Sequence, residues 1–284
     1  LCTAFGAQPF TLDTSRRETN FSPKVTVQYF PWDDLALFAT RATGFKSGGY
    51  NNVPITPNDI EVDEEETVSW EAGAKGTIFD GTLSYSGTFF NMDVENLQVQ
   101  QFLGGTTIVV RNAAGAQSRG FELDAQWLTP WEPLSIRAAG SITDGSFKDF
   151  PDAPAPRSFA SAEQDLSDER LPFLSERQLN VTPELRFPLP WRGLVLGGAL
   201  DVLYASDIYL DVDLDPATLQ DDYVLLNGRV QLAALDERLS FAVSVENLAD
   251  EDILQFATDT PVFSGFMVLQ EYGRTVSAEI RYAW

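Results

Sequence analysis

The sequence has 284 residues, with 42 Asp and Glu against 19 Lys and Arg, which gives a formal net charge of -23. This charge argues against nucleic-acid binding, because phosphate recognition requires basic patches. Since His is absent, His-based acid–base catalysis, hydrolase triads with His and His metal ligands are excluded, and we expect neither an enzyme nor a cofactor. The single cysteine, Cys2, has no partner in the chain for a disulfide or a cysteine metal cluster.

Hydrophobic residues make up 44% of the chain, yet the mean hydropathy is only -0.13. The sequence contains no stretch near the roughly 18 to 20 consecutive apolar residues that a spanning helix needs. A membrane protein of this composition must be a closed β-barrel, because backbone polar groups in lipid need internal partners. The low hydropathy then reflects strands with one lipid-facing and one wet face.

Period-2 alternation of apolar and polar residues recurs along the chain and predicts about eleven strands. The last segment is the clearest, with Val276, Ile280 and Trp284 on one face and Ser277 and Glu279 on the other. Many segments exceed the usual strand length of a globular protein and suit tilted strands that cross a bilayer. The predicted ranges are 23–30, 35–46, 66–79, 82–102, 109–129, 134–150, 177–188, 194–211, 221–235, 239–253 and 274–284.

The connections between these strands alternate in length. Short turns are predicted at 31–34, 80–81, 130–133, 190–193 and 236–238, whereas long acidic loops span 47–65, 151–176 and 254–273. Short turns at one end and long loops at the other are typical of outer-membrane barrels, in which the short end is periplasmic. The sequence therefore predicts an all-β, antiparallel transmembrane β-barrel of the outer-membrane type.

Tryptophans recur at the predicted periplasmic end. Three of the short turns contain a Pro-Trp pair, and the chain's last residue falls at the same level. Amphipathic rings at one level form an interfacial girdle between headgroups and acyl chains. The alternative is turn capping by Pro with Trp present by chance. The girdle would comprise Trp32, Trp131, Trp191 and Trp284.

An odd number of strands raises a problem of closure. The first and eleventh strands run in the same direction and cannot pair as antiparallel neighbours, and single-chain bacterial barrels have even strand numbers. Either a further strand lies in residues 3–13, which gives a stand-alone twelve-stranded barrel acting as a passive pore or autotransporter anchor, or the sequence is part of a larger barrel. The absence of a signal peptide favours the second expectation.

Five segments of the sequence resemble strand-and-turn phrases of the TonB-dependent receptors of Gram-negative outer membranes, in the order of the later half of that barrel. They are ATGFKSGGYN (42–51), ETVSWEAGAK (66–75), NAAGAQSRGFELD (112–124), VENLADE (245–251) and YGRTVSAEIRYAW (272–284).

The resemblance implies the C-terminal half of a 22-stranded barrel whose plug domain is not in this chain. Residues 1–22 would then be an extracellular loop or partial strand, and residues 23–284 the C-terminal strands. It implies active uptake of a scarce nutrient, by default a ferric siderophore, at the Gram-negative outer membrane. The implied partners are TonB with its inner-membrane energising complex (through the plug), the small-molecule substrate, outer-membrane lipid and lipopolysaccharide, and the barrel-assembly machinery through the C-terminal strand.

Two acidic runs, residues 59–66 and 211–222, are predicted to lie in extracellular loops. Carboxylates are hard oxygen ligands that suit calcium. In the second run Asp211, Asp213, Asp215 and Asp222 follow the 1, 3, 5 and 12 spacing of a calcium loop, although Pro216 replaces the glycine that an EF-hand turn requires. The alternative is a solvated acidic rim.

The long loop 151–176 is a candidate ligand-binding segment. Arg157 and Arg170 would grip carboxylate or phosphate groups of a ligand, and Phe159 and Phe173 would stack on its flat groups. Loops of this length are usually functional.

Overall fold

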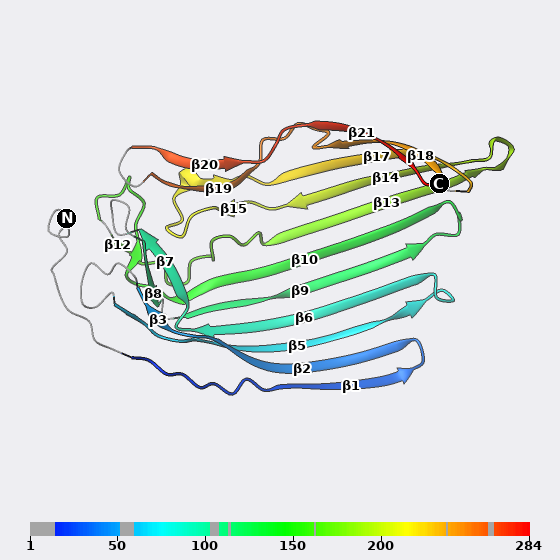
Figure 1. Ribbon diagram of the computed structural model, residues 1–284. Coiled ribbons are helices and arrows are strands. Elements are labelled where there is room, and N and C mark those ends of the chain that lie inside the picture. Colours follow the sequence, from blue (N-terminus) through cyan, green and yellow to red (C-terminus); the bar gives the residue numbers. More distant parts are fainter. Residues whose placement is uncertain are drawn as a thin grey trace.

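The computed structural model describes residues 15–51, 60–102, 108–112, 115–161, 163–236, 238–260 and 264–284. They form one antiparallel sheet of eleven long strands and five two-stranded pairs (Figure 1). Neighbours in the large sheet follow the order of the chain, so the sheet is an open meander with β1 and β21 as its edges. The strand considered within residues 3–13 lies outside the described residues, and residues 15–22 belong to no strand.

The eleven predicted strands correspond one to one with the strands of the large sheet. These are β1 (Lys24–Trp32), β2 (Leu35–Lys46), β5 (Glu65–Ile78), β6 (Leu83–Glu95), β9 (Gly115–Leu128), β10 (Leu134–Asp149), β13 (Arg177–Leu189), β14 (Leu194–Ala205), β17 (Tyr223–Ala234), β18 (Leu239–Glu246) and β21 (Thr275–Tyr282). The prediction of an all-β antiparallel architecture is confirmed.

The five short pairs are built from loop residues. They are β3 (Gly49–Tyr50) with β4 (Glu61–Val62), β7 (Gln98–Phe102) with β8 (Ile108–Asn112), β11 (Ala153–Pro154) with β12 (Glu163–Gln164), β15 (Ile208–Tyr209) with β16 (Leu219–Gln220), and β19 (Leu254–Asp259) with β20 (Phe266–Gln270). Two 3-10 turns, η3 (Pro190–Arg192) and η4 (Pro216–Thr218), complete the described elements.

Several long strands end earlier than predicted, and two of them end at the same tetrapeptide. Val-Glu-Asn-Leu occurs at 94–97 and at 245–248, and β6 and β18 stop at its glutamate. The next residues, Asn96 and Asn247, have positive φ angles of 54° and 50°. Asparagine tolerates this left-handed conformation better than most residues, and it turns the chain out of the ladder. The predicted strand 82–102 is therefore β6 followed by a separate hairpin strand, β7.

The two ends of the sheet differ as the loop lengths predicted. All the tight turns lie at one end, and the short pairs gather at the other (Figure 1). At the turn between β5 and β6, three consecutive residues, Phe79, Asp80 and Gly81, have positive φ angles of 54°, 53° and 82°. Asp and Gly supply the conformations that a tight hairpin needs.

One face of the sheet carries exposed apolar side chains. Residues paired directly across antiparallel strands share a face, and Phe89 pairs with Phe121, which pairs with Ile142. These side chains are 54%, 46% and 65% exposed. The same face continues through Phe241, which pairs with Ile280. An apolar surface of this extent is not stable in water, and it suits contact with acyl chains.

The opposite face is concave and polar. It encloses a hollow of about 870 Å³ whose lining includes Lys75, Ser86 and Asp124. Ion pairs link strands there. Arg137 of β10 pairs with Glu184 of the adjacent β13, and Arg229 of β17 reaches across β18 to Glu279 of β21. Some of the charges on this face are therefore paired between strands, as expected for the inner surface of a wet or plugged lumen.

Two glycines on the concave face make room for aromatic rings. A Cβ atom on Gly73 would lie 2.6 Å from Cζ of Phe38, and one on Gly120 would lie 2.9 Å from Cζ of Phe90. Each glycine is the direct cross-strand partner of its phenylalanine. Each ring packs over the backbone of its glycine, and a larger residue at that position would displace the ring.

Within the part of the chain that the structure describes, no helix has the length and apolar character needed to span a membrane.

Candidate functional site

The short strand pairs and the segments around them form what we call the loop layer, at the end of the sheet opposite the tight turns (Figure 1). It draws on the segments between β2 and β5, β6 and β9, β10 and β13, β14 and β17, and β18 and β21. Because these connections are adjacent at one sheet end, they bring together residues that are far apart in sequence.

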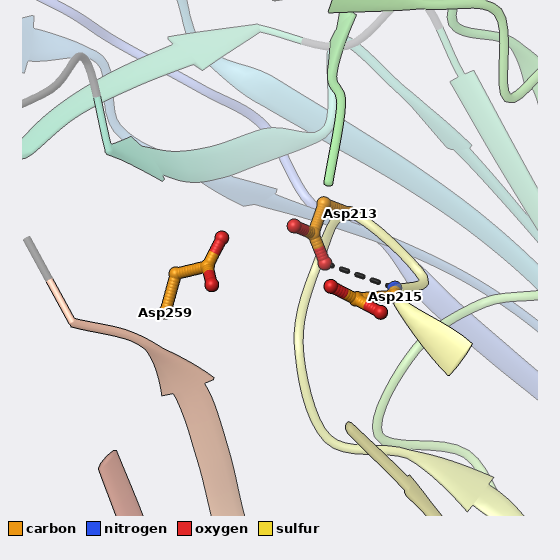
Figure 2. Close-up of side chains that lie close together, drawn as sticks. All are labelled: Asp213, Asp215 and Asp259. Carbon is orange, nitrogen blue, oxygen red and sulfur yellow. Dashed lines mark hydrogen bonds between the residues drawn. The ribbon is translucent and has the colours of Figure 1, made fainter. Parts of the chain in front are cut away.

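Four carboxylates meet where two of these loops come together, and we call them the Asp cluster: Asp211, Asp213, Asp215 and Asp259. Carboxylate oxygens of Asp213, Asp215 and Asp259 all lie within 4.8 Å of one another. Figure 2 shows Asp259 on β19 facing Asp213 and Asp215, which come from the loop between β14 and β17. The Asp cluster therefore joins two separate loops.

The local chain explains why these side chains turn inward. The run Asp-Val-Asp-Leu-Asp alternates, so Asp213 and Asp215 lie on one side while Val212 and Leu214 pack against the apolar core of the loop layer. The Asp213 carboxylate accepts the N–H of Asp215 at 3.0 Å, and the Asp215 carboxylate accepts the N–H of Ala217 at 2.8 Å, which caps η4.

The electrostatics of the Asp cluster are unfavourable without a cation. Asp211, Asp213 and Asp215 are only 8%, 7% and 5% exposed, and within the described part of the chain no Lys or Arg forms an ion pair with them. Burial raises the pKa of Asp213 to about 7, reinforced by repulsion from Asp211, and burial also raises the pKa of Asp211. At an effective dielectric constant of about 20, two charges 4.8 Å apart repel by roughly 3 to 4 kcal/mol.

Three of the four residues of the predicted calcium run belong to the Asp cluster. Asp222 is exposed and lies outside the converging carboxylates. The additional carboxylate, Asp259, follows in another loop, and no linear spacing in the sequence pointed to it. Behind the cluster, the Thr258 hydroxyl is buried beside Asp211 and forms no hydrogen bond of normal geometry.

The predicted ligand-binding residues of loop 151–176 lie in different surroundings. The Arg170 guanidinium donates to the carboxylate of Asp207 at 2.7 Å and to its carbonyl at 2.9 Å, and it stacks 5.5 Å from the centroid of the Tyr209 ring. Arg157 donates to the carbonyl of Thr260. Arg170 thus fastens its loop to the next, while Arg157 reaches the loop after β19.

The two predicted aromatic residues remain open to solvent. Phe159 and Phe173 are each 52% exposed. Phe173 has a positive φ of 59°, and its N–H donates to the carbonyl of Tyr209 at 2.9 Å. Its backbone is therefore held by the neighbouring loop while the ring is presented outward, an arrangement compatible with stacking on a ligand.

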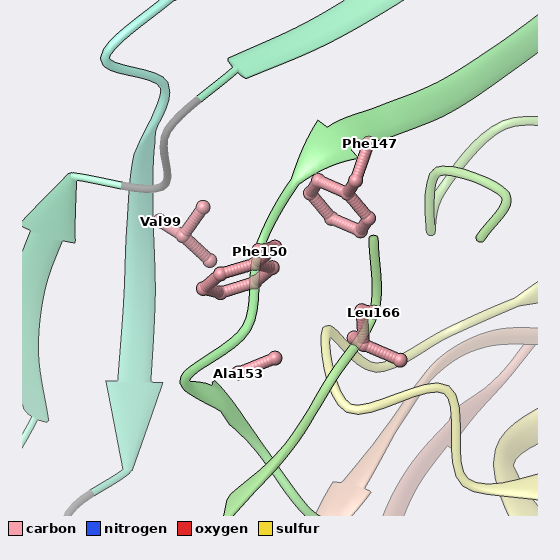
Figure 3. Packing of buried hydrophobic residues seen from close by; sticks show 5 residues of the cluster. All are labelled: Val99, Phe147, Phe150, Ala153 and Leu166. Carbon is pink, nitrogen blue, oxygen red and sulfur yellow. The ribbon is translucent and has the colours of Figure 1, made fainter. Parts of the chain in front are cut away.

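The loop layer has its own apolar core, shown in Figure 3. Phe147 is 1% exposed and Phe150 is 4% exposed, and their rings lie 5.0 Å apart at a tilt of 53°. Val99 of β7, Ala153 of β11 and Leu166 complete the buried set. Phe147 lies at the end of β10 and the other residues come from two different loops, so the core holds these loops in fixed positions on the end of the sheet.

The first acidic run, 59–66, is tied to the segment before β1. Asp59 lies outside the described residues. The Arg16 guanidinium donates to Glu61 at 3.0 Å and to the carbonyl of Val62 at 3.1 Å. This part of the run is neutralised by a basic side chain, in contrast with the Asp cluster.

The predicted tryptophan girdle is distributed along the end of the tight turns. Trp32 ends β1, Trp131 lies in the turn between β9 and β10, and Trp191 lies in η3 between β13 and β14. Trp284 follows β21, whose C-terminal end lies at the same side in Figure 1. Trp32, Trp131 and Trp284 are 69%, 55% and 101% exposed.

Several solved structures that share this architecture are described as siderophore receptors. The ferric yersiniabactin uptake receptor FyuA from Yersinia pestis matches with a TM-score of 0.71 and 21% identity, over 91% of this chain and 36% of that one. The siderophore receptor PiuA from Acinetobacter baumannii matches with a TM-score of 0.69 and 18% identity, over 91% and 35%. FpvA from P. aeruginosa, solved with bound pyoverdines, matches with a TM-score of 0.66 and 18% identity, over 95% and 34%. At these identities the likeness establishes the fold, and the chain spans about a third of the length of these receptors.

The sequence itself matches one protein family over most of its length. Residues 4–248 match the family described as TonB dependent receptor-like, beta-barrel. The match covers ten of the eleven long strands, up to and including β18. The antiparallel meander, the exposed apolar face and the sorted loop lengths agree with it. The chain therefore belongs to the family of TonB-dependent receptor β-barrels.

Proposed function

We propose that this chain forms the C-terminal half of the barrel of an outer-membrane receptor that takes up a scarce nutrient, with a ferric siderophore as the default substrate. One observation carries the proposal: an open sheet with a lipid-type outer face and a structured loop layer matches receptors described as taking up ferric yersiniabactin or binding pyoverdine. A passive pore does not require loops with a core of their own.

In this proposal the concave face surrounds a plug domain, and further strands complete the barrel between β1 and β21. TonB, energised from the inner membrane, would act on the plug. The strand β21 would be the contact for the barrel-assembly machinery, and the outer face would contact lipid and lipopolysaccharide. Trp32, Trp131, Trp191 and Trp284 would lie at the periplasmic interface, where indole rings are favoured.

Substrate contact would fall to exposed side chains of the loop layer. Phe159 and Phe173 offer open aromatic faces, and the Arg157 side chain lies at the surface of the same loop. Arg170 would position the loop through Asp207 and Tyr209 rather than bind substrate directly. A metal-chelate ligand with anionic and flat groups fits this combination of arginine and phenylalanine.

Uptake of radioactive iron by cells that carry or lack the gene tests the proposal, with single ferric siderophores supplied under iron limitation. We expect energy-dependent uptake that is lost when TonB is deleted. Uptake that persists without TonB and admits small solutes unselectively would instead indicate the passive pore. A native polypeptide no longer than these 284 residues would point the same way.

Loop variants locate the substrate contact. Replacing Arg157 and Phe159 by Ala together should raise the substrate concentration for half-maximal uptake about tenfold, equivalent to about 1.4 kcal/mol. Arg192→Ala, an exposed arginine at the opposite end of the sheet, is the matched control and should leave uptake unchanged. Equal effects of both variants would contradict a role for loop 151–176.

A further inference from the structure

We propose that Asp213, Asp215 and Asp259, with Asp211 and Thr258 behind them, form a Ca²⁺ site that joins the loop between β14 and β17 to the β19–β20 hairpin. The proposal concerns a structural metal site and is independent of which nutrient the receptor takes up.

The spacing of the carboxylates fits one ion. Calcium binds oxygen ligands at about 2.3 to 2.6 Å, so two ligands on opposite sides of one ion lie up to about 5 Å apart. The three carboxylate oxygens all lie within 4.8 Å of one another. An ion at their centre would lie at most about 2.8 Å from each oxygen, so small side-chain shifts would bring all three to binding distance. Figure 2 shows these groups facing a common space.

The charge of the cluster requires a counter-ion that the described protein does not supply. Asp213 and Asp215 are 7% and 5% exposed, and their carboxylates accept hydrogen bonds from the backbone N–H groups of Asp215 and Ala217. In the described residues Arg157 donates to the carbonyl of Thr260, and Arg170 donates to the carboxylate of Asp207. Two hydrogen bonds from the backbone do not balance the charge of several carboxylates held this close together, and a bound cation would do so.

A second observation favours the metal over simple protonation. Thr258, 2% exposed, has a side-chain hydroxyl beside Asp211 that forms no hydrogen bond of normal geometry in the structure. A buried hydroxyl without a partner costs free energy, and its oxygen is a further ligand of the kind that Ca²⁺ binds. An ion drawn into the cluster would reorient Asp211, and the hydroxyl would gain an acceptor or become an oxygen ligand.

Calcium suits this site better than magnesium. The cluster offers up to four carboxylates from an irregular loop and a strand, and Ca²⁺ accepts six to eight oxygen ligands in flexible geometry. Magnesium demands near-ideal octahedral geometry at about 2.0 to 2.1 Å and retains several waters. Carboxylates from two separate loops do not present a regular octahedron, so the site favours the larger ion.

Calorimetric titration of the full-length receptor with Ca²⁺ tests the site, using protein refolded free of lipopolysaccharide and treated with a chelator. Asp213→Asn and Asp259→Asn remove one ligand from each loop, and Asp222→Asn is the matched control, because Asp222 is exposed and belongs to the same acidic run. Replacing a crowded buried Asp by Asn relieves repulsion, so both ligand variants should remain folded.

We expect one Ca²⁺ site in the wild type and in Asp222→Asn, with affinity reduced at least tenfold in both ligand variants. Hydrogen exchange should show Ca²⁺ protecting residues 206–222 and 254–260 together. Absence of Ca²⁺ binding, equal loss in the control, protection of one segment alone, or tighter binding of Mg²⁺ than of Ca²⁺ would each overturn the proposal. Because the readouts are binding and protection, a failed uptake assay would leave this result interpretable.

Discussion

The long sheet and the loop layer use the same residue types in opposite ways. In the sheet, Phe89 and Phe121 are 54% and 46% exposed, whereas Phe147, where β10 enters the loop layer, and Phe150 in the loop that follows are 1% and 4% exposed. The sheet is held by its backbone ladder and turns its phenylalanines toward lipid, while the loop layer buries them as a water-soluble domain does. An exposed apolar side chain is therefore favourable on the outer face of the sheet, where it contacts lipid, and unfavourable in the loop layer, where it contacts water.

The largest effect is expected from the core of the loop layer. Phe147→Ala should lower the free energy of unfolding of this layer by roughly 3 to 5 kcal/mol, because it removes a fully buried ring. Hydrogen exchange should then accelerate in the loop layer and at the adjoining end of β10, with the rest of the sheet unchanged. Phe159→Ala, at an exposed position, is the control with an effect below about 0.5 kcal/mol. Acceleration throughout the sheet would show that the two regions unfold as one.

A charge on the outer face of the sheet tests the other half of the comparison. Phe121→Arg should cost roughly 2 to 4 kcal/mol in a bilayer, because a guanidinium is poorly solvated among acyl chains. Ser141→Arg places the same side chain on the concave face beside Glu122, its cross-strand partner, and should be tolerated. Denaturant titration of the full-length receptor in lipid vesicles measures both. A tolerated Phe121→Arg would mean that this face is in contact with water.

The Asp cluster makes the loop layer sensitive to pH when metal is chelated. An unfolded Asp titrates near about 3.9, while the pKa of Asp213 is raised to about 7 in the folded loop. Between these values the folded state binds more protons, so stability falls as pH rises through this window. We expect hydrogen exchange of residues 206–222, corrected for intrinsic exchange rates, to be about tenfold faster at pH 8 than at pH 5. This ratio corresponds to a loss of about 1.4 kcal/mol in local stability, a value that allows for screening by solvent. The Asp213→Asn variant should lose this dependence.

The smallest effect is expected from the arginine that connects two loops. Arg170→Met should destabilise the loop layer by about 1 kcal/mol, because the Arg170–Asp207 pair is partly buried and also stacks on Tyr209. Arg119→Met removes an ion pair with Asp144 whose side chains are 58% and 64% exposed, and its effect should be close to zero. Equal effects of the two variants on hydrogen exchange would show that ion pairs contribute no more to the loop layer than to the large sheet.

Much of the sheet was predictable because its determinants are local. Alternation at β21, with Val276 and Ile280 on one face and Ser277 and Glu279 on the other, indicates a strand and its lipid side without further context. Each strand pairs with its neighbour in the chain, so strand order also follows from the sequence. Strand ends were less predictable, since the left-handed Asn96 and Asn247 end strands whose alternation continues past them.

The sequence by itself determined the architecture of the large sheet, its two faces and its two ends, and it also indicated the family of the chain. Period-2 patterns and tight turns act over a few residues, and a meander has few alternative pairings. Only the tertiary structure decided how the loops meet: that Arg170 binds Asp207, that Phe147 and Leu166 share a core, and that Asp259 completes the cluster of Asp213 and Asp215. Such contacts depend on the packing of side chains from separate loops, and no periodicity in the sequence encodes that packing.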